Sequence, residues 1–177
     1  MEIGAIIIII VVGIILILTF YVIGLYNRLI DAKSKVEDKF KQIDIEIEKV
    51  MDLVPTVASI VRENTKHEEK KIGEVMIGIA LVVDAEDINE RIKFFKGLTG
   101  VLKDMLDLSK TYPELKKNKI FNSFQKSFKE SEGKINYASS FYNEVVDEYN
   151  KLRKTFPLSL VAIILNIKEI DRCEIDK

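Results

Sequence analysis

The chain has 177 residues with 27 basic and 28 acidic side chains, so its formal net charge is only −1. This balance leaves no basic surface for nucleic acid, so we expect no nucleic-acid partner. One cysteine excludes an internal disulfide and one histidine, His67, is too few for the Glu-x-x-His pairs of a di-metal bundle, so we expect no metal, cofactor or small-molecule substrate.

Residues 3–25 form an apolar run without a single charge. About 20 apolar residues cross a hydrocarbon core of roughly 30 Å as a helix, so this run is long enough to span a membrane. It exceeds the roughly 7 to 15 residues of a signal-peptide core, and no A-x-A-like cleavage site follows it. We therefore predict that residues 1–25 are a retained transmembrane anchor, with Ile3, Leu16 and Leu25 at its start, middle and end.

Cations lie on one side of this run only. Apart from the chain amine the N-terminal side has none, whereas the other side carries Arg28, Lys33, Lys35, Lys39 and Lys41. By the positive-inside rule, we expect a single-pass protein of the cell membrane whose large domain faces the cytoplasm.

A heptad pattern follows the anchor directly. Apolar residues alternate in steps of three and four at Leu25, Leu29, Ala32, Val36, Phe40, Ile43, Ile47, Val50, Val54, Val57 and Val61. This spacing is typical of a helix that packs lengthwise against another, so the membrane helix is expected to continue as a rod. Pro55 interrupts the pattern and predicts a kink near Met51.

A second seam of the same kind lies near the C-terminus. Its members are Phe121, Phe124, Phe128, Ser131, Ile135, Ala138, Tyr142, Val145, Tyr149, Leu152 and Phe156. At about 1.5 Å per residue this helix is on the order of 50 Å long, which matches the first rod. We expect its aromatic residues, from Phe121 to Phe156, to form core rather than a ligand pocket.

Two shorter helical patterns lie between the rods, at residues 72–83 and 88–106, separated by the polar sequence DAEDIN and closed by Tyr112-Pro113. The block from Ile72 to Ala80 is so apolar that we expect burial on most sides.

The sequence therefore predicts an all-α protein, in which the N-terminal transmembrane helix continues into an antiparallel up-and-down four-helix bundle, at residues 26–157, with two long outer and two shorter middle helices. Because the middle helices are short, a four-helix head is expected away from the bilayer and a two-helix neck near it.

Residues 158–177 comprise the apolar segment LSLVAIILNI and a polar tail. The segment is too short to span a bilayer. It either lies in the membrane interface, through Leu160, Ile163 and Ile164, or covers the open side of the neck. Cys173 in the tail is expected to be a bystander thiol.

Five polar residues flank the two seams: Gln42, Asp44, Asp52, Asn143 and Asn150. They have two interpretations: a strip that recognises another protein or lipid headgroups, or side chains that bond across the bundle and fix its register. We favour the second.

Several stretches together resemble the LemA family. They are Tyr26-Asn27-Arg28-Leu29, Gln42-Ile43-Asp44, Asp52-Leu53-Val54-Pro55, Tyr112-Pro113-Glu114-Leu115-Lys116, Tyr142-Asn143, Tyr149-Asn150 and Phe156-Pro157. The resemblance implies an N-terminally anchored helical bundle of a prokaryotic membrane protein. It implies no reaction, since the family has no established activity; members are linked to membrane organisation, including magnetosome biogenesis, and some genes lie near those of membrane zinc peptidases.

The sequence also lacks zinc motifs, phosphate-binding glycine loops and nucleophile elbows, so we do not expect an enzyme. The first hypothesis is a membrane-anchored scaffold. Its expected partners are the lipid bilayer and, in addition, an unidentified protein or a second copy of itself. The alternatives are a lipid-binding or bilayer-shaping protein and an accessory subunit of a membrane protease.

Overall fold

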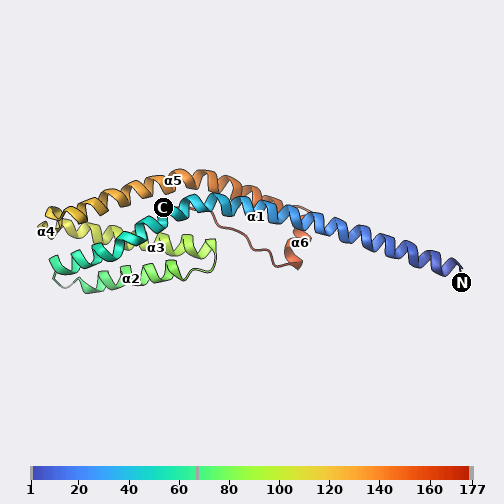
Figure 1. Ribbon diagram of the computed structural model, residues 1–177, viewed down its shortest axis with the longest axis horizontal. Helices are drawn as coiled ribbons and strands as arrows, with labels where there is room; N and C mark the ends of the chain where they lie inside the picture. Colours follow the sequence, from blue (N-terminus) through green and yellow to red (C-terminus); the bar gives the residue numbers. More distant parts are fainter. Residues whose placement is uncertain (1, 67, 176–177) are drawn as a thin grey trace. The chain divides into compact units, whose positions relative to one another are not determined.

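The computed structural model describes residues 2–66 and 68–175, and it is all-α, as predicted (Figure 1). The helices are α1 (Glu2–Asn64), α2 (Glu69–Val83), α3 (Ile88–Asp107), α4 (Pro113–Lys117), α5 (Lys119–Lys154) and α6 (Leu158–Ile164), with a 3-10 turn, η1 (Leu108–Lys110), after α3. The chain forms two compact units. Unit 1 is Met1–Glu37 with Val145–Glu169, and unit 2 is Asp38–Glu144 with Ile170–Lys177, so α1 and α5 contribute to both.

Helix α1 is continuous from Glu2 to Asn64, which confirms that the apolar run and the following heptad pattern form one helix. Its first part, near the N-terminus, is long and apolar enough to cross a membrane, and none of its most apolar window is buried in the protein. The large apolar side chains from Ile3 to Ile23 are 47% to 76% exposed. From Leu29 to Val61 the predicted seam is buried except at Ala32, which is half-buried.

Pro55 lies inside α1, and the helix continues on both sides of it. The carbonyl of Met51 lacks the backbone donor that any other residue at position 55 would supply. The predicted kink at Met51 stays a prediction.

Helix α5 buries the predicted aromatic seam at Phe121, Phe124, Phe128, Tyr142 and Tyr149. The expectation for Phe156 was wrong: this side chain is 75% exposed. The reason is that α5 ends at Lys154, before Phe156-Pro157, so the helical spacing no longer decides which way residue 156 points. Along the seam, Ser139 and Val146 are buried, whereas their predicted neighbours Ala138 and Val145 are half-buried.

Unit 2 packs α2 and α3 against parts of α1 and α5, and successive long helices alternate in direction (Figure 1). The DAEDIN sequence ends α2 and starts α3, where the Asp87 carboxylate caps the helix by accepting from the backbone N–H of Glu90. Helix α2 approaches α3 closely at Gly78, because an added Cβ would lie 2.9 Å from Cδ1 of Leu98.

The expected burial of the block from Ile72 to Ala80 was wrong. Helix α2 buries a single stripe, made of Ile72, Val75 and Val82, and leaves its other large apolar side chains exposed. A helix at the edge of a bundle has neighbours on one side only, so apolar composition all round does not guarantee burial all round.

Unit 1 has its own small core. Leu29 of α1 packs with Leu158, Val161 and Ala162 of α6, and the partly buried side chains that join them are Leu25, Leu152 and Ile167. The inner side of the C-terminal apolar segment therefore packs on α1 in this unit, while Leu160, Ile163 and Ile164 are exposed, and their expected place in the membrane interface stays a prediction.

The residues after α6 bind along α5 instead of forming the polar tail expected from the sequence. Within unit 1, the Tyr149 hydroxyl donates to the Lys168 carbonyl at 2.8 Å. Within unit 2, the Tyr142 hydroxyl donates to the Asp171 carbonyl at 3.0 Å, and Asn143 exchanges two hydrogen bonds with the Cys173 backbone.

Cys173 is buried together with Ile170 and Ile175. The side chains between them, those of Asp171, Arg172 and Glu174, are exposed. Burial raises the pKa of the Cys173 thiol, which keeps it protonated and poorly nucleophilic.

The hydroxyl of Tyr142 offers a test of this C-terminal packing. Replacing Tyr142 by Phe removes a buried hydrogen bond without changing ring volume, so we expect unfolding to cost about 1 kcal/mol less. Tyr137→Phe is the matched control, because Tyr137 on the same helix is exposed. Urea unfolding of the full chain in detergent, followed by circular dichroism, measures both; equal stability of the two variants would contradict the described packing.

Candidate functional site

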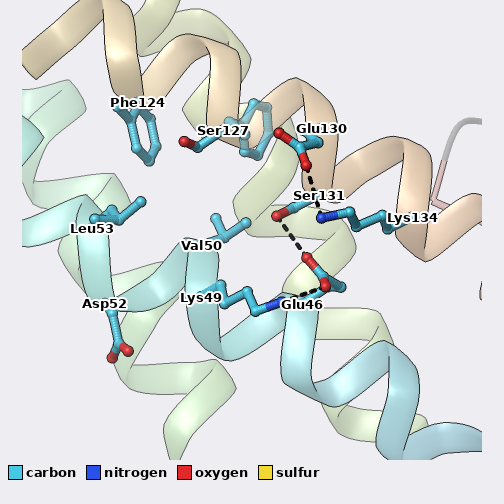
Figure 2. Close-up of a pocket in the computed structure, with 11 residues that line it drawn as sticks. Glu46, Lys49, Val50, Asp52, Leu53, Phe124, Ser127, Glu130, Ser131 and Lys134 are labelled. Carbon is cyan, nitrogen blue, oxygen red and sulfur yellow. Dashed lines mark hydrogen bonds and ion pairs between the residues drawn. The ribbon is translucent and has the colours of Figure 1, made fainter.

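Helices α1 and α5 line a groove in unit 2. It consists of two adjoining cavities of about 350 and 380 Å³ that share Glu46, Glu130 and Lys134. We call it the Glu46 groove. Its apolar wall is formed by Val50, Leu53, Phe124 and Phe128, and its polar wall by Glu46, Lys49, Asp52, Ser127, Glu130, Ser131 and Lys134 (Figure 2). Gln42 and Tyr137 line the second cavity.

Glu46 is the best buried charge in this groove, with 9% of its surface exposed. Its carboxylate accepts from Nζ of Lys49 at 2.6 Å and from the hydroxyl of Ser131 at 3.0 Å (Figure 2). Burial pushes the pKa of Glu46 upward, but the two hydrogen bonds and the nearby ammonium groups of Lys49 and Lys134 outweigh burial, so the pKa is lowered overall.

A second ion pair lies across the groove from Glu46. Nζ of Lys134 is 2.8 Å from Oε1 of Glu130, and this hydrogen bond lowers the pKa of Glu130 and raises that of Lys134. Both groups thus stay charged near neutral pH. A general acid or base works best when its pKa is near the working pH. The pKa values of the Glu46 and Glu130 carboxyls are instead lowered, away from neutral pH. The groove thus combines an apolar wall with ionised side chains that are paired with one another.

The polar residues singled out in the sequence go to different places. Asp44 bonds to Arg91 of α3, so it joins two helices. Asn143 bonds to the C-terminal segment rather than to another helix. Gln42 and Asp52 are exposed along the Glu46 groove, and Asn150 is half-buried on α5.

Arg91 and Glu46 were not found by the sequence analysis. The guanidinium of Arg91 donates to Asp44 and Glu48 of α1 and, at 3.1 Å, to the carbonyl of Val82 at the end of α2. It thereby connects three helices. Two features of the sequence could have pointed to Arg91 and Glu46. Arg91 lies directly beside the apolar stripe of α3, and Ser131 is the one polar aliphatic residue in an otherwise apolar and aromatic seam.

Two apolar surfaces lie outside the groove. In unit 2, the outer face of α2 is formed by Met76, Ile77, Leu81 and Val83, which are 42% to 63% exposed. In unit 1, the outer face of α6 is formed by Leu160, Ile163, Ile164 and Leu165, which are 50% to 80% exposed.

Within residues 2–66 and 68–175, no group of three or more His, Cys, Asp or Glu side chains is placed to hold a metal ion. His67, the one histidine of the sequence, lies outside the described residues.

A scan against protein families matches the LemA family model over residues 39–177. The chain belongs to the LemA family. The match includes the Glu46 groove, Arg91, α2 and α6, and it begins beyond the apolar part of α1. A search of curated proteins finds no match to this LemA-family chain.

The Arg91 contacts predict unequal effects of its two carboxylate partners. Asp44→Ala leaves a largely buried guanidinium without its main partner, so we expect it to lower the free energy of unfolding by about 1 to 3 kcal/mol. Glu48→Ala, the control, removes an exposed carboxylate 3.4 Å from the same guanidinium and should cost less than about 0.5 kcal/mol. A Glu48 variant as unstable as the Asp44 variant would contradict this assignment.

The lowered pKa of Glu46 predicts a pH-dependent contribution to stability. The contribution is complete above the ordinary pKa of 4.5 and is lost as the pH falls through the lower folded-state pKa. We therefore expect Glu46→Gln to be less stable than the wild type at pH 7, with the gap closing in acid. Glu148→Gln, on an exposed position of α5, is the control, and denaturant unfolding across the pH range measures all three proteins.

Proposed function

We propose that this LemA-family protein is a single-pass membrane-anchored scaffold, without catalytic activity of its own, that binds another protein or a second copy of itself. The observation that carries the proposal is the exposed apolar part of α1, continuous with a folded helical domain. Fully burying one large apolar side chain is worth about 1.5 to 3 kcal/mol, so a whole row left in water is strongly unfavourable. A bilayer supplies the missing apolar surroundings.

Cytoplasmic orientation of the domain is part of the proposal. It is supported by the cations that follow the apolar run, beginning with Arg28 and Lys33. Anchoring confines the domain to two dimensions, which raises the effective concentration of any partner held in the same membrane. Weak contacts are then sufficient for association.

The outer face of α2 supports the binding role. Ile77 and Leu81 lie one turn apart on the side of α2 that faces away from its buried stripe, and they are 63% and 44% exposed. Isolated exposed apolar residues are ordinary, but an apolar stripe along a helix matches the helix-in-groove and helix-on-helix modes of protein recognition. The paired, ionised carboxyls of the Glu46 groove support the absence of acid–base chemistry.

Two alternatives are separated by simple observations. A lipid-binding or bilayer-shaping protein would deform vesicles in purified form. An accessory subunit of a membrane protease would co-purify with that peptidase.

The proposal predicts a protein contact at Ile77. A photoreactive amino acid placed there in the full chain, in native membranes, should give a crosslinked product with a partner or with a second copy, because this side chain is exposed in the middle of the α2 face. Lys126, exposed on α5, is the control position and should give little product. No protein adduct at Ile77, or equal yields at both positions, would count against the proposal.

A further inference from the structure

Helix α6 lies beside the end of the apolar run. Its inner residues Leu158, Val161 and Ala162 pack on Leu29, with Leu25 at the edge of the same cluster. Leu25 is the last residue of the apolar run, and Leu29 is one helical turn, about 6 Å, further along α1. A headgroup layer is roughly 5 to 8 Å thick on each side of the hydrocarbon. If α1 crosses a membrane, α6 is held at headgroup depth.

The outer residues of α6 are exposed in the part of the chain that the structure describes. Leu160, Ile163, Ile164 and Leu165 are half or more exposed, and Phe156 just before the helix is exposed as well. The sequence from Phe156 to Ile167 contains no charged residue, in a chain that is 31% charged. In Figure 1, α6 extends away from α1 instead of running along it.

The outer face is held in this position by the chain on its C-terminal side. Asn166 adopts a left-handed conformation with φ 49°, and the Ile167 N–H donates to the Ala162 carbonyl at 2.8 Å, which closes the helix and turns Ile167 into the core. The next residues are tied to α5: Tyr149 donates to the Lys168 carbonyl, and Arg153 and Lys154 both pair with Glu169. The exposed apolar side chains cannot turn inward without breaking these contacts.

We propose that α6 is a second membrane contact, an interfacial helix whose outer face enters the cytoplasmic leaflet next to the anchor. The inference rests on the proposed function for the anchor itself. Lipid is the occupant that this geometry favours, because the face is uncharged, lies one helical turn from the end of the apolar run, and belongs to the same compact unit. Unit 1 also carries the exposed cations Arg28 and Lys151, which suit a unit that meets anionic headgroups.

The absence of tryptophan from the chain allows a direct test. Three single-tryptophan proteins are made in the full chain and reconstituted into phosphatidylcholine and phosphatidylglycerol vesicles: Ile164→Trp on α6, Leu16→Trp in the apolar run, and Ile77→Trp on α2. All three positions are exposed, so the substitutions disturb no core. The readouts are the emission maximum and its quenching by phospholipids brominated at defined acyl positions.

The Ile164→Trp protein should show blue-shifted emission and quenching that is stronger with shallow than with deep bromines, whereas Ile77→Trp should be unquenched. Adding Ile163→Asp to Ile164→Trp should shift the emission back to the red and remove most of the quenching. Emission of Ile164→Trp that matches Ile77→Trp, or a blue shift that depends on protein density and not on brominated lipid, overturns the inference.

The Leu16→Trp protein separates this inference from the proposed function. Quenching of Leu16→Trp by deep bromines together with an unquenched Ile164→Trp leaves the anchor intact and rejects the role of α6. An unquenched Leu16→Trp rejects the anchor, and the role of α6 with it.

Discussion

Burial of one heptad stripe along α1 is the constraint on which the rest of this protein depends. From Leu29 to Val61 the stripe faces other parts of the chain, so the same helix supplies a wall to both compact units. The opposing wall is α5, whose aromatic seam has the same three-and-four spacing. Side chains next to the two stripes, such as Glu46 and Ser131, are brought together by this packing, and they create the polar wall of the Glu46 groove.

The helices were largely predictable from sequence because apolar spacing reports directly which face of a helix is buried. It does not report how many neighbours that helix has. Helix α2 therefore has an exposed apolar face that composition alone did not reveal, and Phe156 is exposed because its helix had already ended. The extended C-terminal segment was missed for another reason: its burial depends on hydroxyl and amide partners, Tyr142 and Asn143, far away in sequence.

The candidate site was predicted less well than the fold. Asp44 does join two helices, but its partner Arg91 was not foreseen, because an arginine between two apolar turns looks solvent-exposed in a sequence. Glu46 was missed since its burial requires Ser131, which lies 85 residues away. Charged groups become structural through such pairings, and pairings between distant residues leave little trace in the local pattern of either helix. The LemA-family match covers all of these residues, but it does not say which of them pair with one another.

The position of the C-terminal segment has a consequence for how the protein is made. Leu158, Val161, Ile170, Cys173 and Ile175 contribute to the cores of both units, and they are synthesised after α1 and α5, the two long helices that those units share. Neither core can therefore close until this segment has been made. Until then the seams of α1 and α5 stay open to chaperones or to a neighbouring nascent chain.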